Sequence, residues 1–278
     1  ERFGDDLLVV AYMNTSGRLK ALAGRTGGAV CTSSNAHLVV DWARKQHKKI
    51  LFVPDEHLGR NAAAKVGMNL DKLVTFPNPL YEGIDWKIDD IPGVDECEMM
   101  LWGGYCGVHT VFTPEHVKYW HGEGWQVLVH PEAPLEVVQV ADGSGSTAFL
   151  WNTVMNAPIG SQFAVGTEGH FVRNLKEQSS MRGIEVRHLA EDMSGDSTSG
   201  EGGCGCATMS RNDPPHLAGM LDLLRKGEPP DLNLVLAGDT VDEQTSKRDR
   251  LSIEDRETLV VDAKNALERM IEITEAAR

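Results

Sequence analysis

The feature that most constrains the fold of this chain is a repeated succession of a short apolar segment and a helix-like segment. Residues Leu7–Tyr12, 29–32 and 50–53 are apolar runs of strand length, and each is followed by polar residues and then by an amphipathic pattern. The same succession returns at 125–129 and 163–165. Strands that alternate with helices form parallel sheets with helices on both faces. The sequence therefore predicts an α/β protein.

The two halves of the chain repeat one arrangement of polar residues. In the first half, an apolar strand ends at 12–14 (YMN), a helix follows, and hydroxyls come at 32–34 (TSS). In the second half, a strand ends at 130–132 (HPE), a helix follows, and hydroxyls come at 146–147 (ST). A repeat of this length indicates duplicated domains. We therefore predict tandem, similar α/β domains with short parallel sheets.

The predicted domain boundaries follow from this repeat. The first domain is expected over residues 1–110 and includes 76–97, an acidic, proline-containing segment that we interpret as an exposed excursion. The second is expected over 111–278, with a flexible Gly- and Ser-rich loop at 190–206. It ends in an amphipathic helix over 252–277, which opens with a capping-box pattern.

Charge and composition exclude several classes of function. The chain has 278 residues and a formal net charge of −14, which argues against a nucleic-acid groove and against binding to anionic membranes. No apolar run reaches the length of a membrane span, and the N-terminal residues resemble neither a signal nor a transit peptide. The first residue is Glu, so we expect that the chain does not begin at a natural start. Five cysteines without scaffold spacing favour the reducing cytoplasm.

Cys106 stands in an unusual short stretch, 102–109 (WGGYCGVH), whose two glycines let the backbone come close to a neighbour. An apolar run precedes the stretch and a helix start signal follows at 113–115. This context places Cys106 at the carboxyl end of a strand, where open α/β sheets bind ligands. Two interpretations remain open, a buried structural cysteine and a thiolate ligand with His109 beside it.

The remaining cysteines leave the kind of site open. Cys204 and Cys206 lie in a glycine-rich loop without the paired C-x-x-C spacing that zinc favours, although with Cys106 and His109 they could still form a zinc site. Single cysteines from separate loops suit an iron–sulfur cluster with an incomplete protein shell, whose free iron acts as a Lewis acid. Two further cysteines have no partner in the sequence and are expected to be structural: Cys31 and Cys97.

Polar residues at the other strand ends suggest proton transfer and anion binding. His130 and Glu132 flank a proline that fixes the turn, so an imidazole and a carboxylate can be held together; the alternative is a solvated turn. Tyr12 and Asn14 could orient a planar polar ligand. Hydroxyls that precede helices either cap them or bind phosphate or carboxylate: Ser33, Ser34, Ser146 and Thr147. After the strand at 50–53, Asp55 is the expected helix N-cap, and Arg60 a brace or an anion contact.

Taken together, these stretches closely resemble the quinolinate synthase family. The resemblance covers almost the whole chain in the right order. The motifs that carry it are YMNTSGRLKA at 12–21, CTSSNA at 31–36, PDEHLGRN at 54–61, WGGYCGVH at 102–109, HPE at 130–132, GST at 145–147, GTE at 166–168 and CATMSRN at 206–212.

The resemblance implies two of the three similar three-layer α/β/α domains that this family arranges around a pseudo-threefold axis, with a [4Fe-4S] cluster at the centre. It implies a quinolinate synthase, a transferase that condenses iminoaspartate with dihydroxyacetone phosphate, with loss of phosphate and water, in de novo NAD biosynthesis. The cluster would be the Lewis acid. L-aspartate oxidase would supply iminoaspartate, and no nucleic-acid or membrane partner is expected.

The resemblance also implies roles for individual residues. Cys106 and Cys206 would be cluster ligands, with Cys204 a bystander or redox partner of Cys206, Cys31 not a ligand, and His109 a support behind the ligands. Glu132 would be the general acid/base, His130 would orient the substrate carbonyl, and Tyr12 would be the third catalytic residue. The substrate would be bound by Tyr12, Asn14, Ser33, His130, Glu132, Ser146 and Thr147.

The sequence departs from the family pattern in three places. Ala133 and Ala207 replace the usual cysteine and proline. The family's first domain, which carries the third cluster cysteine, is missing, so we expect this chain alone to hold a cluster poorly and to turn over little or nothing. Two other functions are kept as alternatives, a non-catalytic α/β remnant that binds small anions and a zinc-bound structural module.

Overall fold

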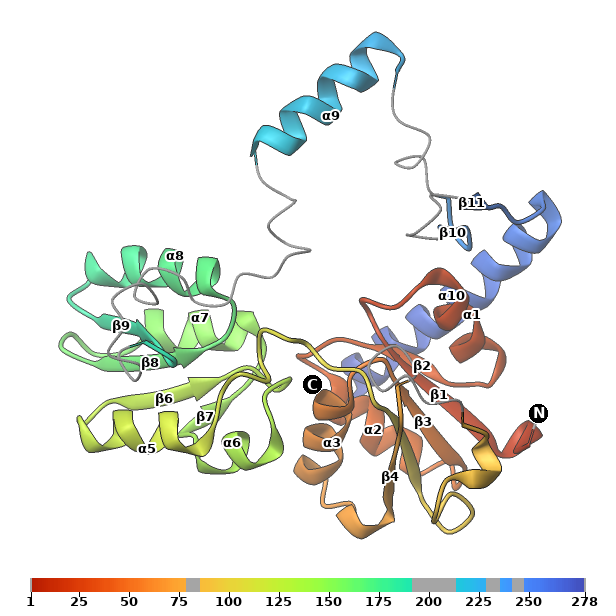
Figure 1. The fold of residues 1–278 in the computed structure, drawn as a ribbon, viewed down its shortest axis with the longest axis horizontal. Coiled ribbons are helices and arrows are strands. Elements are labelled where there is room, and N and C mark those ends of the chain that lie inside the picture. Colours follow the sequence, from red (N-terminus) through yellow and green to blue (C-terminus); the bar gives the residue numbers. More distant parts are fainter. Residues whose placement is uncertain (1, 79–85, 192–213, 229–235, 242–247, 278) are drawn as a thin grey trace.

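The structure is a computed structural model, and it describes residues 2–78, 86–191, 214–228, 236–241 and 248–277. Within these residues the chain forms two parallel sheets, each with helices on both faces, and one short antiparallel pair (Figure 1). The predicted α/β class with parallel sheets is confirmed.

The first sheet has five parallel strands in the order β2-β1-β3-β5-β4. Four of them lie where the apolar runs predicted strands, whereas β4 is a short strand that the pattern did not reveal. The short 3-10 helix η2, Leu70–Lys72, leads directly into β4. The strands are β1 Leu7–Tyr12, β2 Ala29–Cys31, β3 Lys49–Val53, β4 Leu73–Phe76 and β5 Met99–Trp102.

Two helices of the first sheet, α1 and α3, begin at the residues that the sequence marks as caps. Ser16 accepts a hydrogen bond from the Leu19 amide, and Asp55 accepts one from the Leu58 amide. Each bond satisfies a backbone N–H that has no partner within the helix. The helices are α1 Gly17–Arg25, α2 Ala36–Arg44 and α3 Glu56–Lys65.

Alternate residues of the central strands pack on opposite faces of this sheet, which produces a three-layer arrangement. Leu8, Val10 and Phe52 pack against α2 and α3, whereas Val9 and Ala11 pack against α1 and α10. Because helices cover both faces, the strands are apolar on both sides, as expected for a parallel sheet.

The segment at 76–97, predicted as an exposed excursion, has both exposed and buried residues where the structure describes it. Ile91, Val94 and Cys97 are buried and pack with Phe76 and Met100, and the acidic side chains between them are exposed. Widely spaced apolar residues therefore anchor the segment on β4 and β5. The segment contains a short 3-10 helix, η3, Ile88–Asp90. Another 3-10 helix, η1, Gly4–Asp6, directly precedes β1.

The second sheet has four parallel strands in the order β7-β6-β8-β9. Val127 and Val129 face α5 and α6, whereas Leu128, Phe163 and Val165 face α7 and α8. This sheet is again the middle of three layers. Its elements are α5 Pro114–Gly122, β6 Gln126–Val129, α6 Leu135–Val140, β7 Gly143–Ser144, α7 Thr147–Met155, β8 Gln162–Gly166, α8 Gly169–Ser180 and β9 Glu185–His188.

The last helix, α10, Ile253–Ala276, packs on the first sheet and lies along α1 (Figure 1). The sequence prediction grouped it with the second domain, so its packing differs from that grouping. The predicted apolar stripe does face a core, because Leu259 and Ala266 are buried. Before it come α9 Pro214–Lys226, β10 Thr240–Val241 and β11 Arg248–Asp249. Most of the loop predicted at 190–206 lies outside the described residues.

Candidate functional site

The polar residues at the carboxyl ends of the two sheets meet at the junction between the sheets. Tyr12 ends β1, Cys106 follows β5, and His130 and Glu132 follow β6. His109 lies one turn beyond Cys106. Ligand sites of parallel sheets lie at this edge, and here the edges of both sheets contribute to one group of side chains.

The backbone around Cys106 is held by the start of α3. A Cβ on Gly104 would lie 2.3 Å from the Pro54 carbonyl oxygen, so only glycine fits there. The Glu56 amide donates to the Gly104 carbonyl at 2.8 Å. The Asp55 carboxylate accepts from the Leu58 amide at 2.7 Å with one oxygen and from the Cys106 amide at 3.0 Å with the other. The predicted N-cap is therefore also a brace for the cysteine.

Cys106, His109 and Glu132 form a compact group of donor atoms. Their Sγ, imidazole nitrogen and carboxylate oxygen all lie within 4.8 Å of one another. Such a set of sulfur, nitrogen and oxygen atoms can bind iron or zinc. Nδ1 of His109 lies 2.8 Å from Oε2 of Glu132, yet this buried nitrogen has no hydrogen bond of acceptable geometry among the described residues. A donor atom left without a hydrogen bond in a buried polar group fits a metal centre at this place.

His109 is positioned by contacts on its other sides. Its Nε2 lies 3.1 Å from the hydroxyl of Thr167, which is 1% exposed. Its ring stacks on His130 with the ring centroids 4.5 Å apart. Thr167 belongs to the motif at 166–168, but no role was predicted for it. Only its position directly after β8, at a strand end, could have indicated one.

Tyr12 joins the first sheet to this group. Its hydroxyl lies near the Glu132 carboxylate and Ser33, close enough for both to affect its pKa. Asn14 and Thr147, which the sequence also assigned to substrate binding, are exposed. Cys206 and Cys204 lie outside the described residues, so the structure says nothing of their positions.

Burial and mutual repulsion shift the pKa values at the site. Burial, followed by the Glu132 charge, raises the pKa of Tyr12, and the same two causes raise the pKa of Cys106 to about 11 and that of Asp55 to about 7. Burial and the neighbouring His109 lower the pKa of His130 to about 4. Burial alone would raise the pKa of Glu132, but His109, His130 and Tyr12 hold it below its usual value. At neutral pH the site thus has an ionised Glu132 and a neutral His130.

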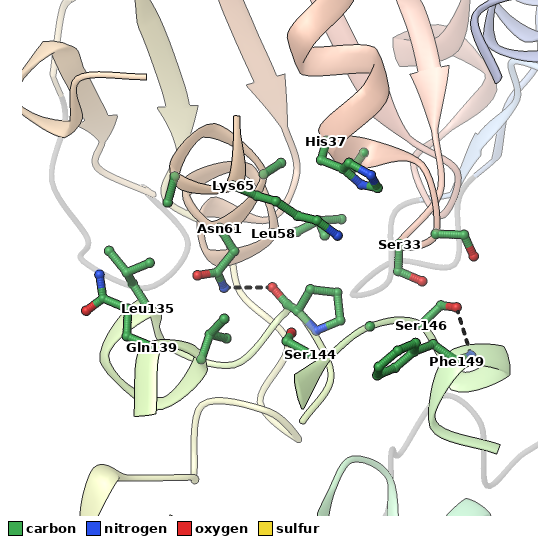
Figure 2. A pocket seen from close by; sticks show the side chains of 17 residues that line it. Ser33, His37, Leu58, Asn61, Lys65, Leu135, Gln139, Ser144, Ser146 and Phe149 are labelled. Atoms are coloured by element: carbon green, nitrogen blue, oxygen red, sulfur yellow. Dashed lines mark hydrogen bonds between the residues drawn. The ribbon is translucent and has the colours of Figure 1, made fainter. Parts of the chain in front are cut away.

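A cavity of about 610 Å³ adjoins this group between α2 and α3 on one side and α6, β7 and α7 on the other (Figure 2). Ser33 and Ser146 lie in its wall, on opposite sides of the junction. Asn61 of α3 crosses the junction, donating through Nδ2 to the carbonyl oxygens of Pro131 and Ala133, both at 2.8 Å. The residues predicted to bind anions are therefore partly brought together here.

Three other residues that the sequence marked for attention have surroundings that fit a structural role. Arg60 bonds to Thr75 at 2.7 Å and lies 3.7 Å from Glu56, so it is a brace. Cys31 and Cys97 are buried and free. None of the described helices is both long enough and apolar enough to cross a membrane.

Comparison with known proteins gives a consistent result. A sequence model of the family described as "Quinolinate synthetase A protein" matches residues 2–272. The quinolinate synthase of Geobacillus sp. (strain WCH70) is 39% identical over 230 residues, which are 82% of this chain and 58% of that protein. That of Listeria monocytogenes is 33% identical over 275 residues, which are 98% of this chain and 65% of that protein. The chain thus spans about three fifths of the length of these relatives.

Proposed function

Because this chain belongs to the quinolinate synthetase A family, we propose that it carries part of the active site of a quinolinate synthase. The reaction would condense iminoaspartate with dihydroxyacetone phosphate, with loss of phosphate and water, in de novo NAD biosynthesis. The observation that supports this proposal is the compact group of the partly exposed Cys106 and the buried His109 and Glu132, with Tyr12 beside Glu132.

The residues present fit an iron–sulfur centre. The Cys106 thiol is partly exposed at the junction of the sheets and stands in the donor group. We propose Cys106 and Cys206 as ligands of a [4Fe-4S] cluster, with a third cysteine contributed by a domain that is not among these 278 residues. When bound, such a cluster supplies a Lewis-acidic iron with an open coordination position. Loss of the Cys106 proton would accompany binding, because the thiolate is the ligand.

The protein's own groups would bind the substrates and move protons. Glu132 is ionised and 5% exposed, so its carboxylate can take a proton from a substrate carbon or nitrogen and return it to a departing hydroxyl. Tyr12 lies beside that carboxylate and would donate a hydrogen bond that holds its orientation. His130, neutral at pH 7, can donate a hydrogen bond to a substrate carbonyl without placing a positive charge there. Asn14, Ser33, Ser146 and Thr147 are proposed to bind the carboxylate and phosphate groups.

The cellular compartment and the enzyme that supplies iminoaspartate are proposed on the same basis. Three free cysteines among the described residues suit the reducing cytoplasm. Iminoaspartate is short-lived in water, so an enzyme that oxidises L-aspartate would have to supply it, and we propose L-aspartate oxidase in that role. No nucleic-acid or membrane partner is proposed.

Metal analysis of the protein purified without oxygen tests this function. We expect substoichiometric iron and acid-labile sulfide in the wild-type chain, and a loss of both in Cys106→Ser. Cys97→Ser is the matched control, because Cys97 is buried elsewhere and its thiol only donates to the Val94 carbonyl. If Cys106→Ser retains as much iron and sulfide as the control, the proposed cluster ligand is wrong.

Two alternatives give different results in the same measurements. A structural zinc module would contain stoichiometric zinc and no sulfide. A non-catalytic anion-binding remnant would bind dihydroxyacetone phosphate but would respond neither to the loss of Cys106 nor to Glu132→Gln. The synthase proposal expects Glu132→Gln to keep the iron and to lose substrate-dependent changes in the spectrum of the site.

A further inference from the structure

The cavity beside the catalytic group has a charge that is opposite to that of the whole protein. The chain contains 41 Asp and Glu residues and has a net charge of −14. The wall of the cavity nevertheless contains no acidic residue among those that the structure describes, and it does contain Lys65 and His37. In an acidic protein, a concave site without carboxylates is a place where an anion is repelled least.

Lys65 is available to a ligand. It extends from the last turn of α3 toward His37 at the start of α2, and both side chains lie over the same opening (Figure 2). Lys65 is exposed and forms no ion pair with a described residue. Burial, and then the Lys65 charge, lowers the pKa of His37, although the Asp41 carboxylate acts in the opposite direction. At neutral pH His37 is therefore a neutral hydrogen-bonding group beside the positive charge of Lys65.

Backbone dipoles point into the same cavity from both sheets. α2 and α7 are each nine residues long, and the first turns of both contribute to the wall. Asn35 at the start of α2 makes no side-chain capping bond, and Ser146 caps α7. The N-terminal ends of helices carry partial positive charge and favour phosphate. Hydroxyls of Ser33, Ser34 and Ser146 stand beside them.

The buried catalytic group has the opposite character. It contains the buried carboxylate of Glu132, and the carboxylate of Asp55 accepts from the Cys106 amide beside it. A dianion is therefore disfavoured at the catalytic group and favoured in the cavity, and Ser33 links the two because it contacts Tyr12 and lines the cavity.

We propose that this cavity holds the phosphate monoester end of the substrate, and that Lys65 and His37 are the residues that select a dianion there. This inference rests on the proposed function and adds two residues to it. Lys65 supplies the charge, and His37 donates a hydrogen bond. Neither role could be predicted from the sequence, because Lys65 resembles any other helical lysine. Only its position one turn after Asn61, on the same face of α3, distinguishes it.

Titration calorimetry of the full chain with glycerol phosphate, inorganic phosphate and succinate tests the proposal. We expect glycerol phosphate and phosphate to bind more tightly than succinate. Lys65→Gln should weaken phosphate binding about tenfold, because it removes a charge-assisted hydrogen bond, and Lys65→Arg should restore most of it. His37→Gln should weaken binding less. Lys48→Gln, which removes an exposed lysine outside the cavity, is the matched control.

The outcomes separate this inference from the proposed function. If Ser146→Ala weakens phosphate binding but Lys65→Gln matches Lys48→Gln, the assignment of Lys65 is wrong and the anion site of the proposed function remains. If succinate binds as tightly as phosphate and both respond to Lys65, the cavity binds anions without selecting the dianion. If none of the variants changes binding, both the inference and the anion-binding part of the proposed function fail.

Discussion

Asn61 connects the first sheet to the loop at 130–133, which follows β6 of the second sheet. It lies on α3, is 6% exposed, and its Nδ2 donates to the carbonyl oxygens of Pro131 and Ala133 on either side of Glu132. Asn61→Ala leaves both buried oxygens without their partner. At about 1–1.5 kcal/mol for each lost hydrogen bond, we expect the free energy of unfolding to fall by about 2–3 kcal/mol.

Two further variants make this prediction specific. Asn61→Asp keeps the shape but places a carboxylate oxygen against the two carbonyl oxygens, so we expect a larger loss than for alanine. Asn152→Ala removes an exposed asparagine from α7 and should change stability by less than about 0.5 kcal/mol.

Urea unfolding, followed by tryptophan fluorescence, measures these differences, and amide exchange locates them. Exchange should accelerate at residues 130–133 in Asn61→Ala and remain unchanged in Asn152→Ala, because only the first variant releases the loop. The reasoning is refuted if Asn61→Ala is as stable as Asn152→Ala, or if it loses stability while the 130–133 amides stay protected.

Three further predictions concern other parts of the molecule. The pKa of Asp55 is raised to about 7 in the folded protein. Its protonated form therefore contributes fully to stability below about pH 4, and this contribution is lost as the pH rises through 7. When the free energy of unfolding is measured between pH 4.5 and 8, it should decline less steeply in Asp55→Asn than in the wild type. A Cβ on Gly24 would lie 1.9 Å from the Asp262 carbonyl oxygen. Gly24→Ala should therefore separate α1 from α10 and speed amide exchange in α10. Gly122→Ala is the control and should leave this exchange unchanged, because the space around Gly122 is open. Anaerobic reconstitution of this chain alone should give substoichiometric clusters, since two proposed cysteine ligands are too few, and a stable cluster at full occupancy would contradict this.

The local sequence determined the class of fold and the residues of the site. Apolar runs of strand length fixed β1, β3, β5 and β6, and the caps Ser16 and Asp55 fixed helix starts, because these signals depend on neighbours in the chain. The strand ends also identified Tyr12, Cys106, His130 and Glu132. The structure brings all four together around Glu132 at one junction, whereas Asn14 and Thr147 stay exposed.

Contacts between distant residues were decided only by the tertiary structure. The pairing of β4 with β5, the burial of Ile91 and Val94, and the packing of α10 on the first sheet each join segments far apart in the chain. So do the bonds from Asn61 to the 130–133 loop and from Asp55 to Cys106. The sequence around a residue indicates whether its side chain will be buried or will form hydrogen bonds. Which residue it then contacts depends on which surfaces meet when the sheets assemble. The sequence therefore determined the helices, the strands and the polar residues at the strand ends. The packing of the two sheets determined which of these polar residues lie together in the candidate site.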